Sequence, residues 1–170
     1  MSEEIEKTDH SESTACCPRF DSTPWDGSTH QWEDKLFIKD SIRQIFHIPM
    51  PSSITRTIQR MWAKATKVNA NLDAKDFLLL AYDPSPWKCE YYMAVAKEVP
   101  EADNVKISGT FFSKVFDGPY SAVPKWIKEM EEVLHSQGKK SKKYYFYYTT
   151  CPKCAKLYGH NYVVAFAESE

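Results

Sequence analysis

The pattern of apolar and polar positions predicts a strand, a helix and two further strands in the first part of the chain. The opening strand covers residues 36–48 and stops at Pro49 or Pro51, because proline lacks the amide donor of a sheet ladder. A helix follows from about Ser53, with Ser52 or Ser53 as its cap. Its apolar face repeats at intervals of three and four residues and comprises Ile54, Ile58, Met61, Trp62 and Ala65. Residues 77–82 and 87–99 predict two strands joined by a proline-rich turn.

The same order of elements recurs from residue 105. Residues 105–116 predict a strand, and a turn then leads into a second helix with Ser121 as cap and Pro124 in its first turn. Gly138 supplies a left-handed exit from this helix. The apolar stripe of the helix comprises Val123, Trp126, Ile127, Met130, Val133 and Leu134. Residues 144–150 and 161–168 predict the closing strands.

This order predicts an α+β fold built from two strand-helix-strand-strand modules. Such a chain forms an antiparallel sheet with both helices on one face. Residues 1–14 are polar and acidic, so we expect them to be disordered. Residues 15–35 combine aromatic residues with turn formers, which is typical of an irregular arm that packs over the body as a lid or strap. Residues 36–170 then form the folded domain.

Composition narrows the classes of function. The chain has 170 residues, of which 42% are hydrophobic, enough to close the core of one domain. A net charge of −1 argues against broad electrostatic capture of nucleic acid. The basic cluster Lys139, Lys140, Lys142 and Lys143 follows Gly138 and is interpreted as a solvated loop. Five scattered glycines offer no loop to hold phosphate, so we expect no cofactor.

The expected compartment is the cytoplasm, with no membrane partner. No apolar stretch approaches the roughly 18 residues that cross a bilayer. The N-terminus also lacks the basic and apolar regions of an export signal. The five histidines show no metal-ligand spacing among themselves, and we assign them no chemistry.

Five consecutive aromatic residues at positions 144–148 put large rings on both faces of a strand. An ordinary core accounts for one face, and the other needs a second cover, such as another segment, a partner or an organic ligand. In the strand of residues 87–99, one face carries Glu90, Tyr92, Ala94 and Ala96. Rings stack, alanines leave room and a carboxylate attracts a cation, which is typical of a cleft floor for aromatic or cationic small molecules. A solvated sheet face is the alternative.

The candidate ligand-binding residues combine an acid with rings from both modules. The acid is Glu90, and as a single unpaired carboxylate in an apolar cleft it would have its pKa raised by desolvation. The rings are Tyr92, Tyr145 and Tyr147, with Trp87, Trp25 and Phe112 as rim or lid contacts. For each ring taken singly, core packing is the alternative role.

The repeated element order, the segment Phe116-Asp117-Gly118-Pro119-Tyr120 and the strand of residues 144–150 resemble the GyrI-like small-molecule-binding domains. The resemblance covers about residues 36–168, and the two cysteine segments are similar to those of a stand-alone bacterial branch. It implies two modules related by a pseudo-twofold axis, with a cleft for lipophilic, often cationic, aromatic compounds. No helix-turn-helix is predicted before the domain, so sequestration or sensing is expected rather than direct DNA binding.

The resemblance has one departure and one enzymatic alternative. Many GyrI-like proteins carry a glutamate in the strand after the second helix, and Tyr145 stands there in this chain. Glu90, from the other module, is the expected substitute for this acid, and Glu168, near the end of its strand, is a weaker candidate. Some GyrI-like proteins hydrolyse cyclopropane-bearing alkylating agents with an acid and aromatic residues, so a hydrolase of such compounds is the alternative to a binding protein.

Four cysteines offer a further possibility. Cys151 and Cys154 have the two-residue spacing of a zinc knuckle, and Cys16 and Cys17 complete four thiolates if the arm folds back. Adjacent cysteines fit one metal poorly, and thiols without a metal are the default in a reducing compartment. A redox pair is a third interpretation, although no parallel thioredoxin-like unit is predicted.

Overall fold

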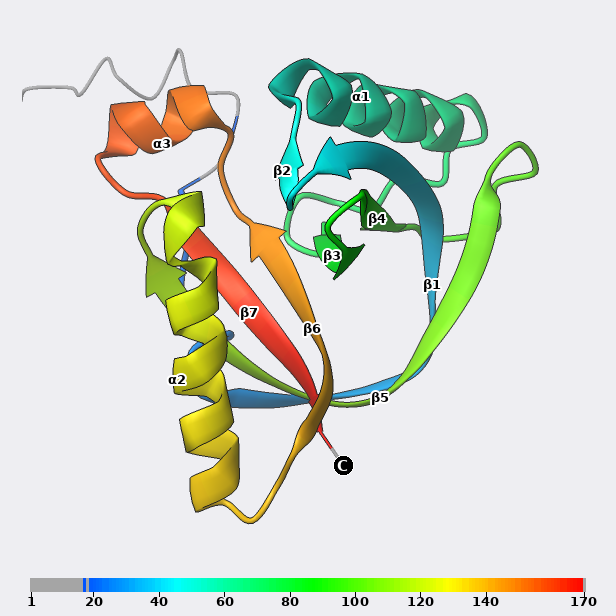
Figure 1. Cartoon of the computed structure of the whole chain (residues 1–170). Helices are drawn as coiled ribbons and strands as arrows, with labels where there is room; N and C mark the ends of the chain where they lie inside the picture. Colours follow the sequence, from blue (N-terminus) through cyan, green and yellow to red (C-terminus); the bar gives the residue numbers. More distant parts are fainter. Residues whose placement is uncertain (1–16, 18, 170) are drawn as a thin grey trace, which may run out of the picture.

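The computed structural model describes residue 17 and residues 19–169, which fold into a curved sheet flanked by helices (Figure 1). The predicted disorder of residues 1–14 and the predicted metal ligand Cys16 therefore lie outside the described residues. The elements in chain order are β1 (Ser28–Ile45), β2 (Ile48–Pro49), α1 (Pro51–Lys67), β3 (Leu79–Ser85), β4 (Lys88–Ala94), β5 (Asp103–Asp117), the 3-10 turn η2 (Tyr120–Ala122), α2 (Val123–Ser136), β6 (Ser141–Tyr148), α3 (Pro152–Tyr158) and β7 (Tyr162–Ser169).

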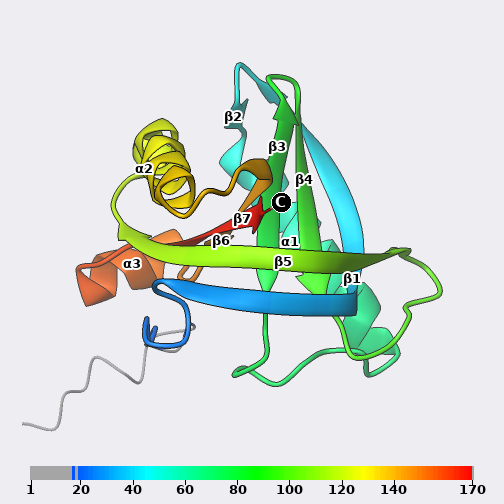
Figure 2. The same cartoon turned by 90° about the horizontal axis from the view of Figure 1, so that it is seen from below.

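The strands close into a barrel. Their order in the sheet is β2-β1-β4-β3-β6-β7-β5, every pairing is antiparallel, and β1 also pairs with β5. Figure 2 shows β1 and β5 running side by side where the sheet closes. The predicted antiparallel sheet is confirmed, but it wraps on itself instead of staying open. Closure leaves an outer face, which the helices cover, and an inner face.

Both predicted helices pack on the outer face. Helix α1 buries Met61 and Ala65 against β1, β3 and β4, whereas α2 buries Trp126, Met130 and Leu134 against β5, β6 and β7. Ala81 on β3 and Phe146 on β6 are paired partners, and each belongs to the cluster beneath one of the two helices. Paired residues share a face of a sheet, so α1 and α2 cover the same face, as predicted.

The helix ends differ from the prediction in one respect. Met50 and Ala122 occupy the N-cap positions, and neither supplies a side-chain cap, so the predicted caps Ser52, Ser53 and Ser121 are wrong. Proline near the start of each helix instead fixes a suitable backbone angle and removes an amide that has no intrahelical partner. The predicted left-handed exit at Gly138 is confirmed by its φ of +69°.

The N-terminal arm contains more regular structure than predicted. Strand β1 begins at Ser28, not at residue 36, and a bulge between Trp32 and Lys35 divides it. The left-handed φ of +46° at Asp34 accompanies this bulge. Strand β3 continues through Ser85, where a turn was predicted, and α3 follows β6 where no helix was predicted.

Aromatic side chains fill the inside of the barrel. Phe37, Phe111 and Phe166 are fully buried there, and Trp32 lies 4.3 Å from Phe111 and 5.5 Å from Phe166 between ring centroids. Trp25, ahead of β1, contacts Phe166 edge-on at 5.8 Å. The expected cleft on the face opposite the helices is therefore occupied by side chains of the chain itself, including the arm. Among the described residues, no helix has the length and apolar character that a membrane crossing requires.

Replacing Phe166 with alanine should lower the free energy of unfolding by about 3–5 kcal/mol, because the ring is fully buried among other rings. Urea denaturation followed by circular dichroism measures this change. Phe46→Ala makes the same chemical change at a ring that is 70% exposed and contacts Trp87 in a tilted arrangement, and it should lose less than about 1.5 kcal/mol. Equal losses in the two variants would contradict the assignment of the inner core.

Candidate functional site

The inner face ends in a charged group of side chains contributed by β1, β3, β4 and β6. Tyr82 on β3 is paired with Glu90 on β4, which puts both side chains on one face. Tyr92 follows Glu90 at a spacing of two, and Tyr145 follows Lys143 at the same spacing on β6. Strand pairing therefore brings two predicted site residues of the first module, Glu90 and Tyr92, together with Tyr145 of the second.

Glu90 is buried and paired. The residue is 7% exposed. The Tyr92 hydroxyl donates a hydrogen bond to Glu90 Oε2 at 2.6 Å. Glu90 Oε1 lies 3.1 Å from Lys88 Nζ and 3.3 Å from Lys39 Nζ. The expectation of an unpaired carboxylate is therefore wrong. Two cations and one hydroxyl compensate for the loss of water around this acid.

The partners of Glu90 reverse the expected direction of its pKa. Burial by itself raises the pKa, but the hydrogen bonds from Tyr92, Lys88 and Lys39 together outweigh it. The pKa of Glu90 is consequently lowered from the ordinary value of 4.5, so the group is a carboxylate at neutral pH.

Lys143 lies among three tyrosines, Tyr82, Tyr92 and Tyr145, which we call the tyrosine cage. Lys143 Nζ is 3.8 Å from the ring centroid of Tyr82, 4.8 Å from that of Tyr145 and 5.7 Å from that of Tyr92. These distances are typical of cation–π contacts. The interpretation of Lys143 as part of a solvated loop is wrong, since β6 already begins at Ser141.

The tyrosine cage partly buries the ammonium group of Lys143 and so shields its charge from water. Burial lowers the pKa of Lys143, and Lys39 acts in the same direction, while Glu90 and Glu168 oppose them. Glu168 on β7 is the strand partner of Lys143, which places a second acid beside the cage. Burial also raises the pKa of Tyr92 and of Tyr145, so both hydroxyls stay neutral and can donate hydrogen bonds at neutral pH.

The remaining candidate rings lie elsewhere. Tyr147 is deeper in the barrel, 6.3 Å from Trp25 between ring centroids, so this pair is part of the interior filling. Phe112 is buried beneath α2 on the outer face. Trp87 is 56% exposed and contacts Phe46 with tilted rings, 5.1 Å apart between centroids. The structure thus brings Glu90, Tyr92, Tyr145 and Glu168 to one place and sets Phe112 and Trp87 apart from it.

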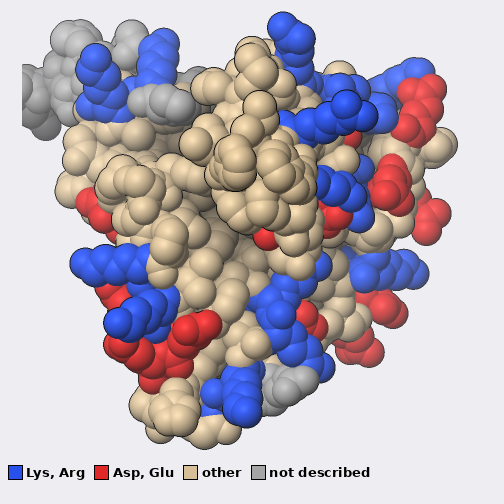
Figure 3. Space-filling model, in the orientation of Figure 1, with Lys and Arg blue, Asp and Glu red and all other residues tan. Residues whose placement is uncertain are grey.

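Trp87 belongs to an exposed apolar area around β2. Figure 3 shows uncharged side chains gathered over β2, with lysine, arginine and acidic residues around them. The exposed apolar residues of this area are Ile45, Phe46, Ile48, Met50 and Trp87. A different surface adjoins Glu90, because Lys39 and Lys88 also line an open polar groove of about 480 Å³ with Arg60 and Lys64.

Sequence reasoning missed the basic half of this site. Lys88 and Lys143 each stand two residues from a candidate on the same strand. Lys39 is paired with Tyr92 on the neighbouring strand. Tyr82 stands two residues after the buried Leu80 on the same strand and therefore shares its face. The period of two that placed Tyr92 and Tyr145 on the inner face also places these residues there.

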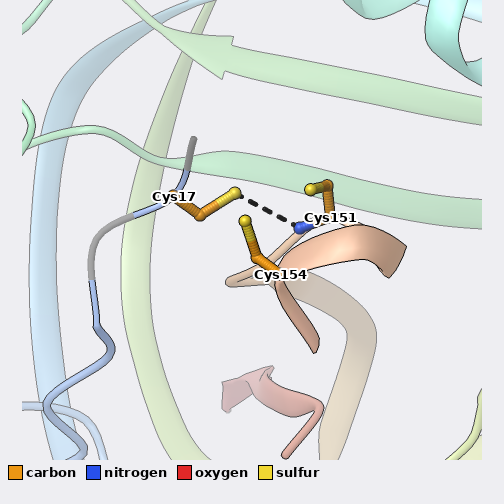
Figure 4. Close-up of side chains that lie close together, drawn as sticks. All are labelled: Cys17, Cys151 and Cys154. Carbon is orange, nitrogen blue, oxygen red and sulfur yellow. Dashed lines mark hydrogen bonds between the residues drawn. The ribbon is translucent and has the colours of Figure 1, made fainter. Parts of the chain in front are cut away.

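Three of the candidate metal ligands come together at the end of α3. The Sγ atoms of Cys17, Cys151 and Cys154 all lie within 4.8 Å of one another (Figure 4). The backbone N–H of Cys151 donates to Cys17 Sγ at 3.4 Å. Cys154 is fully buried, and the other two are partly buried. The structure thus gathers a set of soft sulfur ligands on the outside of the barrel.

A family model described as bacterial hydrolase matches residues 7–169. The chain belongs to the bacterial hydrolase family. Comparison with curated proteins gave no match. The matched residues include the barrel, the tyrosine cage and the cysteine cluster.

Solved structures share the fold of this family member. The C-terminal domain of EcmrR has a TM-score of 0.65 at 12% identity, covering 86% of this chain and 98% of that chain. A hydrolase from Listeria innocua has a TM-score of 0.62 at 11% identity, covering 84% and 91%. SAV2435, solved with bound tetraphenylphosphonium, has a TM-score of 0.50 at 13% identity, covering 84% and 93%. At these identities the likeness shows the fold alone, which is consistent with the resemblance to GyrI-like domains.

Glu90 should contribute to the acid sensitivity of the fold. A carboxylate with a lowered pKa in the folded state stabilises it above the unfolded-state pKa, and this contribution is lost as the pH falls through the folded-state value. The difference in unfolding free energy between wild type and Glu90→Gln should therefore shrink on acidification below about pH 4.5. Urea unfolding over a pH series measures it, with Glu98→Gln as a surface control. A difference that grows on acidification would contradict the lowered pKa.

Proposed function

We propose that the protein binds lipophilic aromatic cations at the tyrosine cage, where the Lys143 ammonium group now lies. The observation that carries the proposal is this ammonium group, within cation–π distance of three rings and flanked by Glu90 and Glu168. Such an arrangement is a formed binding site for positive charge. A ligand enters by displacing the Lys143 side chain from the rings.

The chemistry of the cage favours breadth over selectivity. Stacking on each ring contributes about 0.5–1.5 kcal/mol beyond the buried area, and ring faces accept many ligand shapes. Tyr92 is held by its hydrogen bond to Glu90, so the ring is oriented before a ligand arrives. Glu90 and Glu168 favour a cation over a neutral compound. Broad recognition of this kind suits sequestration or sensing of multidrug-type compounds.

The fold gives independent support for the class of ligand. SAV2435, which has the same fold, was solved with tetraphenylphosphonium, a lipophilic aromatic cation. In this chain the interior beyond the cage is packed with rings such as Phe37, Phe111 and Trp32. A bulky ligand therefore rests on the cage or moves rings of the arm, and a small planar cation needs less rearrangement.

The internal lysine makes the proposal testable. Lys143→Met keeps the apolar stem but removes the competing charge, so affinity for N-methylacridinium should rise roughly tenfold, which corresponds to about 1.4 kcal/mol. Affinity for neutral acridine should change much less. Fluorescence titration with both probes measures the two affinities.

Two controls separate the cage from general charge effects. Lys142→Met removes the same charge from an exposed neighbour and should leave both affinities nearly unchanged. Glu90→Gln should lower the affinity for the cation more than that for acridine, whereas Glu101→Gln, at a surface ion pair with Lys67, should not. Equal effects of Lys143→Met and Lys142→Met, or equal losses of both probes with Glu90→Gln, would contradict the proposal.

A hydrolase of cyclopropane-bearing alkylating compounds is the second candidate function. The family is named for hydrolysis, and the ionised Glu90 beside the Tyr92 hydroxyl has the composition of a water-activating pair. In the proposed hydrolysis, Glu90 accepts a proton from water, the water oxygen bonds to a carbon of the cyclopropane ring, and one C–C bond of that ring breaks. The electron pair of that bond moves into the conjugated system, which then takes up a proton.

Mass spectrometry distinguishes turnover from binding. Incubation with a cyclopropane-bearing alkylating agent should give a product heavier by one water, at a rate that Glu90→Gln lowers by about 10²-fold or more. The Glu101→Gln variant provides the matched control. A compound that binds to the cage but breaks down no faster than it does without protein would rule out this activity and leave the binding function intact.

A further inference from the structure

We propose that Cys17, Cys151 and Cys154 bind one zinc ion, which fastens the N-terminal arm to α3. The three sulfur atoms lie within 4.8 Å of one another and come from two segments 134 residues apart in sequence. Zinc prefers thiolates in a tetrahedral arrangement, and two of these ligands have the two-residue spacing found in structural zinc sites. The site lies outside the barrel and does not depend on the proposed cation binding.

The geometry fits a metal better than it fits a disulfide. With Zn–S bonds of about 2.3 Å, the sulfur atoms of a tetrahedral site are about 3.8 Å apart. The observed cluster reaches that spacing by a contraction of at most about 1 Å, which side-chain rotation provides. A disulfide joins only two sulfur atoms, at about 2.05 Å, whereas all three sulfur atoms of this cluster lie within 4.8 Å of one another.

Hydrogen bonding around the cluster also favours thiolates. The Cys151 N–H donates to Cys17 Sγ at 3.4 Å, and a donor of this kind stabilises the negative sulfur that a metal requires. Cys154 is fully buried, so its sulfur points into a protected volume. Partial exposure of Cys17 and Cys151 leaves a path for the ion.

The segment that the ion would hold is the one that fills the barrel. The Tyr158 hydroxyl on α3 donates to the Cys17 carbonyl at 2.6 Å, and Arg19 lies 4.8 Å above the Tyr158 ring. Phe20 packs on Tyr162 at 5.7 Å, and Trp25 then enters the interior. An ion bound only when these segments meet stabilises the folded state in proportion to its affinity. Its role is therefore structural.

Metal content provides the first test. The protein, produced with zinc in the medium and purified without a histidine tag, should contain one zinc per chain by plasma mass spectrometry. Cys17→Ala, Cys151→Ala and Cys154→Ala should each lower zinc affinity at least tenfold. Cys89→Ala makes the same change at a buried cysteine beneath α1 and should retain the ion. Chelation should lower the melting temperature of wild type and Cys89→Ala but not that of Cys151→Ala.

Cobalt substitution counts the thiolates. Replacing zinc with Co²⁺ should give sulfur-to-cobalt charge-transfer absorption whose intensity grows with each cysteine ligand. Cys16 precedes Cys17 in sequence and is the remaining thiol of that segment. Loss of one quarter of the absorption in Cys16→Ala would give four thiolates, and unchanged absorption would give three with a water in the fourth position.

Three results would overturn the inference. The first is a folded, reduced wild type that takes up neither zinc nor cobalt. The second is a mass lower by two hydrogens without reductant, together with a mapped bond between any two of the three cysteines. The third is loss of zinc from Cys89→Ala equal to the loss from Cys154→Ala.

Discussion

The pairing of β1 with both β4 and β5 is the constraint on which the rest of the molecule depends. Because β5 stands at the far end of the strand order from β1, its pairing with β1 joins the two ends of the sheet and closes it, so each strand of the ring has one inner and one outer face. The outer face is covered by α1 and α2, and the inner face has only itself and the arm to cover it. The consecutive rings of β6 are needed because both faces of that strand are buried.

Closure also determines the electrostatics of the cage. A carboxylate on the inner face loses most of its water, so Glu90 is stable there only with the donors that its own strand and the neighbouring β1 bring to it. Lys39 comes from β1, whereas Lys88 and Tyr92 come from the same strand as Glu90. The acid, its two lysines and the caged Lys143 therefore form one group whose members depend on the strand register.

The sequence predicted most of the elements and half of the site. Regular periodicity located α1, α2 and the strands, and the alternation along residues 87–99 placed Glu90 and Tyr92 together on the face opposite the core of the first module. The start of β1 was missed because polar residues and a bulge at Asp34 interrupt its alternation. Lys143 was missed because neighbouring lysines after a glycine resemble a loop. The filling of the interior by Trp25 and Trp32 depends on contacts between distant segments, which local patterns do not encode.

If the tyrosine cage binds cations as proposed, Lys143 sets an affinity threshold that any other cation has to exceed. Because Lys143 is tethered to β6, its effective concentration at the rings is of millimolar order or higher, whatever the composition of the cell. Hydrophilic amines, which bind water strongly, would gain too little from the rings to displace Lys143. Cations with large apolar surfaces gain both from the rings and from leaving water, so under the proposed function Lys143 would favour the binding of lipophilic cations over hydrophilic ones.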